Sequence, residues 1–208
     1  MYIETPNSED FSRIVGIYEK QYEKLELVYR DALANFQVKN LNDFDKDYLV
    51  SILTQYLFKW GKMARVLGFK GCETLGSKLI TMDSQLKNFK QESLSTIDLT
   101  KNAGKITVTY DEIMNTRWKS NRGRIKRVGP TSTSKALHLF SPNLFILWDR
   151  AIRNYYGFND NGIEYTRFLM TMQSWLKELK PTIERLQEQC GKSYTKIIDE
   201  YNWIKCRS

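Results

Sequence analysis

Apolar residues recur at intervals of three and four along the first long segment of the chain, from Asp10 to Phe36. Because an α-helix makes one turn in 3.6 residues, this spacing collects them on one helical face. The same period runs from Asp45 to Leu67, and Gly68 follows where a helix end is expected. Two long amphipathic helices are therefore predicted. Their apolar positions are Phe11, Ile14, Tyr18, Tyr22, Leu25, Tyr29, Leu33 and Phe36, then Tyr48, Ile52, Tyr56, Trp60 and Met63.

The remainder of the chain also favours helices, since period-two alternation is weak and confined to residues 106–109. We expect an all-α fold with no internal repeat, and an irregular link over 90–106. It is either one domain or two interleaved lobes. In the second case residues 43–156 form one lobe, and the N- and C-terminal helices pack together. The further helices are expected at 72–89, 108–118, 130–140, 149–156, 163–179, 181–190 and 193–204.

Cysteine and histidine usage excludes several kinds of site. The three cysteines, Cys72, Cys190 and Cys206, form no Cys-x-x-Cys pair, which argues against a zinc ribbon and a disulfide framework. A single histidine, His138, cannot build a His-rich metal site. It is either a buried, hydrogen-bonded ring or a catalytic base. We therefore expect no metal and no cofactor.

The hydropathy pattern bears on location. No apolar run approaches the roughly 18 residues that span a bilayer. The acidic N-terminal stretch lacks the basic and apolar regions of a signal peptide. We expect a cytoplasmic protein, associated with the nucleoid if the source is prokaryotic. Residues 178–208 mix both signs of charge evenly and predict a helix pair with a polar outer face.

The positive charge is concentrated in one short window. The whole chain carries a net charge of +8, whereas residues 117–127 alone hold six basic side chains and no acidic one. Such a cluster attracts polyanions, and nucleic acid is the commonest of these inside cells. Trp118 interrupts the run and is a candidate wedge that stacks on a base. The alternative is a solvated loop with no dedicated partner. The basic residues are Arg117, Lys119, Arg122, Arg124, Lys126 and Arg127.

A phosphate-binding arrangement is expected directly after this window. We predict a basic helix end, a tight turn at Val128–Gly129, and a new helix that begins at once. Backbone N–H groups at a helix start are unpaired and carry the positive end of the helix dipole. With the hydroxyls of Thr131 and Ser132 they form a seat for a phosphate group, to which Lys135 is also assigned.

The stretch of about residues 125–153 resembles the helix–hairpin–helix DNA glycosylases, whose hairpin reads roughly Leu-Pro-Gly-Val-Gly-x-Lys-Thr-Ala. Val128-Gly129 match the second half of that turn, and Ser132-Thr133 match its Thr-Ala step. Asp149 falls 18 residues after Thr131, the family's lysine-to-aspartate spacing. The resemblance implies a helical fold with a helix–hairpin–helix motif, double-stranded DNA as the partner, and a catalytic aspartate at Asp149.

The chain departs from the family at three hairpin positions. Lys126 replaces the proline, Arg127 replaces the first glycine, and Thr131 replaces the lysine that attacks the sugar in bifunctional members. Lys135 lies one helical turn later, outside the motif position. The resemblance therefore implies a monofunctional enzyme without lyase activity.

Base excision requires a carboxylate beside the sugar and a pocket for an extruded base. Asp149 would stabilise the positive charge that grows on the deoxyribose, and it would orient or deprotonate water. Its alternative role is to cap the helix that follows. Trp60 and Trp148 are candidates for stacking on the extruded base, although the helical spacing of Trp60 also fits core packing.

These inferences predict a DNA-binding monofunctional N-glycosylase that flips out and removes a damaged or modified base. Its role would be DNA repair or antiviral defence against modified foreign DNA. Two alternatives remain open at this point. One is a non-catalytic DNA-binding module, and the other is a basic helical scaffold that binds an acidic protein.

Overall fold

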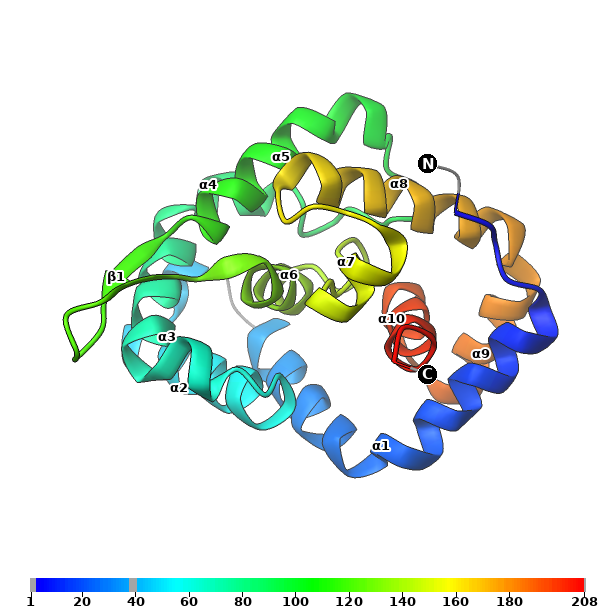
Figure 1. The fold of residues 1–208 in the computed structure, drawn as a ribbon, viewed down its shortest axis with the longest axis horizontal. Helices are drawn as coiled ribbons and strands as arrows, with labels where there is room; N and C mark the ends of the chain where they lie inside the picture. The colour runs from blue at the N-terminus through cyan, green and yellow to red at the C-terminus, as the bar shows by residue number, and fades with distance from the viewer. Residues whose placement is uncertain (1–2, 38–40, 208) are drawn as a thin grey trace.

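The computed structural model describes residues 3–37 and 41–207. This part of the chain contains ten α-helices and one two-stranded sheet. Helices α6 (Gly129–Phe140) and α10 (Tyr194–Lys205) run through the middle of the molecule, and the other long helices surround them (Figure 1). The all-α expectation is confirmed except for the small sheet. None of the described helices is long and apolar enough to cross a membrane.

The first predicted helix is observed as α1 (Ser8–Gln37). It packs along α10, where the rings of Phe11 and Tyr201 stack with centroids 4.8 Å apart. The helix adjoining α10 in sequence, α9 (Lys180–Cys190), also contacts α1. Segments at opposite ends of the sequence therefore form one side of the molecule.

The prediction of a single helix from Asp45 to Leu67 is wrong, because the chain turns in the middle of this segment. Helix α2 (Lys46–Gln55) continues into a π-helical turn, η2 (Tyr56–Trp60), and then stops. Gly61 lies so close to Leu57 that an added Cβ would be 2.7 Å from the Leu57 carbonyl oxygen. Lys62 then adopts φ 55°, which turns the chain toward the next helix.

Helix α3 (Ala64–Thr81) contains the second interruption of this region. Gly68 does not end it but forms a kink, with φ 61° and ψ 176°. Only glycine adopts such angles without strain. The pattern therefore located the break in helical geometry correctly, while the chain resumes a helix immediately afterwards.

The boundaries from α6 onward agree more closely with the sequence pattern than those before it. The predicted link over 90–106 is wrong in its second half, because α5 begins at Leu99, after the side chain of Asp98 caps its start. The short 3₁₀ turn η1 (Leu41–Asp43) precedes α2. The remaining helices are α4 (Asp83–Lys87), α5 (Leu99–Met114), α7 (Arg150–Tyr156) and α8 (Gly162–Glu178).

A continuous hydrophobic core connects these elements. Aromatic rings dominate the part between α5 and α8, where Tyr110 and Tyr165 stack with centroids 4.3 Å apart. The segment between α6 and α7 lies within this core and is tied to α6, since the backbone N–H of Trp148 donates to Ser134 Oγ at 3.0 Å. This contact fixes the position of the residue that follows, Asp149.

The sheet is an antiparallel β-ribbon formed by β1 (Arg117–Lys119) and β2 (Ile125–Arg127), and it projects from one end of the molecule (Figure 1). Its tip turns at Gly123, which has φ 74°. The base is closed by a hydrogen bond from the Val128 N–H to the Thr116 carbonyl oxygen, 3.0 Å long. The basic window is therefore a β-ribbon and not the helix end that the sequence predicted, because α5 already ends at Met114.

Candidate functional site

The β-ribbon is attached to α3 by its inner face. The Trp118 ring lies against Gly71, where an added Cβ would come within 2.8 Å of the ring. Trp118 pairs across the ribbon with Lys126, whose Nζ donates to the Val66 carbonyl oxygen at 3.2 Å. Only 6% of Trp118 is exposed, so the prediction of an exposed wedge is wrong. Its role is to hold the ribbon in place.

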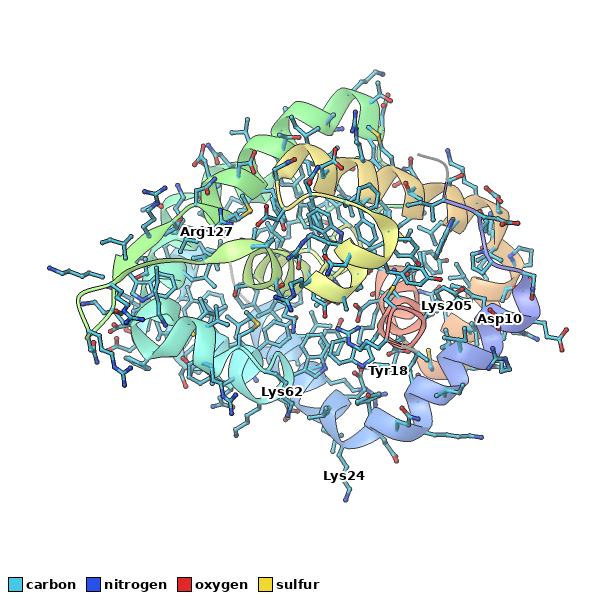
Figure 2. The ribbon with its side chains drawn as sticks, in the orientation of Figure 1. Asp10, Tyr18, Lys24, Lys62, Arg127 and Lys205 are labelled. Carbon is cyan, nitrogen blue, oxygen red and sulfur yellow. The ribbon has the colours of Figure 1, made fainter. Side chains whose placement is uncertain are left out.

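The outer face and tip of the ribbon carry cations without acidic partners. Arg117, Lys119, Arg122 and Arg124 are exposed, and within the described residues no ion pair involves any of them. Arg127 differs from these four because it pairs with Asp160 at 3.0 Å, beside the base of the ribbon (Figure 2). The unneutralised charge predicted for this window is therefore present on five of its six basic residues within the described part of the chain, since Lys126 also forms no ion pair.

A groove of about 570 Å³ separates the ribbon from the kinked part of α3. Its walls carry four basic side chains and one acidic side chain, that of Glu73. Phe69, directly after the Gly68 kink, also lines the groove and is 60% exposed. The four cations are Lys70, Arg122, Arg124 and Lys126.

The start of α6 does not form the predicted phosphate seat in full. Gly129 has φ 75° and is half-buried, as is Thr131, so these two residues remain near the surface. Ser132, however, is completely buried. Lys135 is 5% exposed, and its Nζ donates to the Gly61 carbonyl oxygen at 2.8 Å. The assignments of Ser132 and Lys135 to DNA contacts are therefore wrong, because the helix turns both side chains into the interior.

Asp149 opens α7 as its N-cap. One carboxylate oxygen accepts a hydrogen bond from the Ile152 N–H at 3.1 Å, and the other forms an ion pair with Arg207. The guanidinium group of Arg207 also stacks on Trp203, 3.6 Å from the ring centroid. The Asp149 side chain is 16% exposed, so it is held in place by both contacts but is still open to solvent.

The two tryptophans proposed for a base pocket have different surroundings. Trp148 is fully buried against Tyr165 and Phe168, with centroid distances of 5.2 and 5.8 Å, so it is a core residue and the pocket assignment is wrong. Trp60 is half-buried and stacks on Tyr56 at 5.1 Å. Its indole N–H donates to Glu26 at 3.4 Å.

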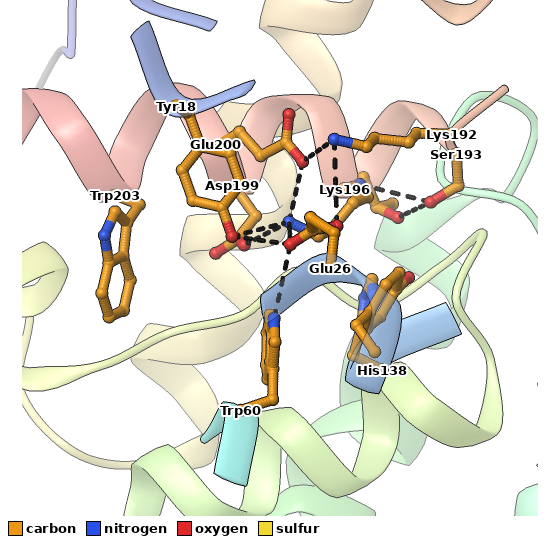
Figure 3. A network of polar contacts seen from close by, with 12 residues as sticks. Tyr18, Glu26, Trp60, His138, Lys192, Ser193, Lys196, Asp199, Glu200 and Trp203 are labelled. Carbon is orange, nitrogen blue, oxygen red and sulfur yellow. Dashed lines mark hydrogen bonds and ion pairs between the residues drawn. The ribbon is translucent and has the colours of Figure 1, made fainter. Parts of the chain in front are cut away.

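Glu26 belongs to a buried polar cluster between α1 and α10 (Figure 3). At its centre is Lys196, whose Nζ lies 3.2 Å from Glu26, 3.7 Å from Asp199 and 2.9 Å from Glu200. Lys192 provides a second cation 2.6 Å from Glu200. The prediction of a polar outer face on the C-terminal helix is therefore wrong for Lys196, Asp199 and Glu200, because these residues face α1.

Burial and charge set the pKa values within this cluster. Burial alone would lower the pKa of Lys196, but the neighbouring carboxylates, Glu200 above all, hold it well above its usual value. Burial raises the pKa of Asp199 to about 7, against the attraction of Lys196. Lys135 lies over the Trp60 ring, 5.1 Å from its centroid, and burial lowers the pKa of this lysine to about 8, although Asp149 opposes the shift.

His138 is a buried ring with both nitrogens hydrogen-bonded. Nδ1 lies 2.6 Å from the Phe145 carbonyl oxygen, which can only accept, so Nδ1 carries the proton. Nε2 then accepts from the Tyr29 hydroxyl at 2.8 Å. Burial lowers the pKa of this imidazole to about 4. Of the two roles considered, the structure therefore supports the buried, neutral ring.

Within the described residues, no group of three or more His, Cys, Asp and Glu side chains is arranged to hold a metal ion. The sequence signal missed in α10 is the spacing of Lys196, Asp199 and Glu200, which puts both acids one helical turn from the lysine. It does not reveal that this face is buried.

Comparison with known proteins finds no matching family model, curated protein or solved structure.

Proposed function

We propose that the protein binds double-stranded DNA through the β-ribbon. The observation that carries this proposal is the set of four exposed cations without acidic partners, all on one projecting element. Phosphate groups are the complementary ligand, and they supply most of the affinity of non-specific DNA binding. The major groove of B-form DNA also admits a two-stranded ribbon. The ribbon therefore takes the place of the helix start as the main DNA contact.

Attachment of the ribbon supports the same proposal. The contact between Trp118 and Gly71, together with the hydrogen bond from Lys126 to Val66, connects one face of the ribbon to α3. The opposite face is left to solvent. A cationic element that is held in one orientation loses less conformational entropy on binding than a mobile loop does.

The test is to neutralise the four exposed cations that lack acidic partners together, as R117Q/K119Q/R122Q/R124Q, and to measure DNA affinity at several salt concentrations. The slope of log K against log salt should fall by about 3 to 4, since each lost phosphate contact removes about 0.9 in B-form DNA. The matched control, K20Q/K24Q/K46Q/K177Q, removes the same charge from exposed lysines on other helices. Equal slopes for the two variants would reject the ribbon as the DNA contact. An absence of DNA binding by the wild type would favour the scaffold alternative.

A second candidate function is excision of a damaged or modified base, for which the position of Asp149 is the supporting observation. The carboxylate follows α6 and a connecting segment, opens α7, and is open to solvent. The same order is implied by the resemblance to the glycosylases. In this proposal Asp149 stabilises the positive charge that develops on the deoxyribose. Because Arg207 occupies one of its oxygens, that ion pair must open when DNA binds.

Asp149→Asn separates this chemistry from the structural role of the residue. Asparagine also caps helices well, so α7 should persist. With duplexes that carry a panel of damaged and phage-type modified bases, the wild type should produce alkali-labile sites and D149N should not, while both bind DNA. If the wild type binds these duplexes and leaves every one intact, the non-catalytic DNA-binding module is the correct function. Damaged bases as substrates would indicate repair, and phage-type bases would indicate defence.

A further inference from the structure

We infer that the groove between the ribbon and α3 holds an unpaired stretch of DNA strand, with one base stacked on Phe69. This inference rests on the proposed DNA binding and specifies the kind of DNA that the protein prefers. It is drawn from the combination of an exposed aromatic ring with four cations in one groove.

The kink at Gly68 explains why Phe69 is exposed. Leu67, before the kink, is 2% exposed and belongs to the core, whereas Phe69, after it, is 60% exposed. The positive φ of Gly68 redirects the chain between these two residues. An aromatic ring is thus presented to solvent beside the ribbon, although the adjacent apolar side chain is buried.

The surrounding charge indicates a polyanionic ligand. Lys70 lies next to Phe69 on α3, and Arg122 and Arg124 face the same groove from the ribbon tip. Within the described residues none of these three cations forms an ion pair. The helical turn after the kink also begins here, and the positive end of its dipole adds to the local potential.

An aromatic ring between cations is typical of surfaces that bind single strands, because bases stack on the ring while the cations follow the phosphates. In a fully paired duplex each base face is already covered by its neighbours. Phe69 can therefore contribute only when the DNA offers an unpaired base. The ribbon would bind the flanking duplex, and the groove would receive the unpaired segment.

The experiment compares two fluorescein-labelled probes by anisotropy, a fully paired duplex and the same duplex with a central unpaired bubble. The wild type should bind the bubble about 10-fold more tightly, within the range that stacking of one base provides. Phe69→Ala should lose this preference and retain its affinity for the paired duplex. Phe69→Trp should keep the preference. Leu27→Ala, at an equally exposed position on α1, should behave as the wild type.

A second readout detects the stacking itself. With 2-aminopurine at the unpaired position, binding of the wild type should quench its fluorescence, and binding of F69A should not. If the wild type binds both probes equally, or if F69A and wild type show the same preference, the inference is overturned while duplex binding by the ribbon stands. If neither probe binds, the proposed function fails together with the inference.

Discussion

The ammonium nitrogen of Lys196 lies 2.9 Å from Oε1 of Glu200, and both side chains are fully excluded from solvent. The same nitrogen is 4.4 Å from the centroid of the Tyr18 ring. Since Tyr18 and Glu26 are on α1, the lysine connects the two ends of the chain through charge as well as through packing. A buried charge of this kind is stable only while its partners remain in place.

Replacing this lysine should therefore destabilise the fold severely. Lys196→Met removes the central cation of the cluster and leaves the carboxyl groups of Glu26, Asp199 and Glu200 in the interior with Lys192 as the neighbouring cation, and the free energy of unfolding should fall by about 3–5 kcal/mol. Lys24→Met is the control on α1, where the side chain projects into solvent (Figure 2), and it should change stability by less than about 0.5 kcal/mol. Urea denaturation followed by circular dichroism measures the free energy of unfolding of both variants. Similar small losses in the two variants would show that the carboxylates are neutral.

The neutral state of His138 predicts a loss of stability in acid. Its pKa is about 4 in the folded protein and about 6.5 in the unfolded chain, so the unfolded state binds the proton first. The stabilisation that comes from the neutral His138 ring is complete above about pH 6.5 and is lost as the pH falls to about 4. The loss is up to about 1.4 kcal/mol per pH unit in that window. His138→Gln should be less stable at neutral pH, and its free energy of unfolding should fall less steeply with decreasing pH than that of the wild type. Parallel plots of unfolding free energy against pH for the two proteins would contradict the neutral state of His138.

Asp199 predicts a pH dependence of opposite sign. Its pKa of about 7 in the folded protein exceeds the value near 3.9 of an unfolded chain, so the folded state holds the proton more tightly. The stabilisation that comes from the protonated Asp199 carboxyl group is complete below about pH 4 and is lost as the pH rises through about 7. The stability of the wild type relative to Asp199→Asn should fall by up to about 1.4 kcal/mol for each pH unit as the pH rises across that range. A constant difference across the titration would mean that the folded pKa is not raised.

Gly71 should be intolerant of any side chain. In Gly71→Ala the new Cβ would be 2.8 Å from the Trp118 ring and 3.1 Å from Leu67, and this overpacking should cost about 1–3 kcal/mol of unfolding free energy. Because the same contact attaches the ribbon, DNA affinity should fall as well.

Gly104→Ala is the matched control, since nothing lies within 4 Å of its Cβ position in α5. Alanine in an exposed helix interior should raise stability by about 0.5–1 kcal/mol. Thermal melts and DNA titrations of both variants provide the comparison. An equal gain in stability from both substitutions would show that Trp118 is not seated on Gly71.

Local patterns accounted for much of the helical structure. The bounds of α6 to α10 follow from apolar spacing and from capping side chains such as Asp149, Asn161 and Ser193, each of which accepts a backbone N–H in its own first turn. These interactions join residues a few positions apart, so they are visible in the sequence. The excess of positive charge in residues 117–127 is visible for the same reason.

Contacts between segments far apart in the sequence decided the structure of the basic window and the burial of the charged side chains. The basic window forms a ribbon with one anchored face because Trp118 meets Gly71 on another helix. Lys196 and Lys135 are buried because their partners, Glu26 and Gly61, come from segments far away in the chain. Amino-acid type sets the charge and helical period of each segment. The fold determines which charged side chains are neutralised in the interior and which remain exposed to solvent, because desolvation depends on neighbours that no local pattern specifies.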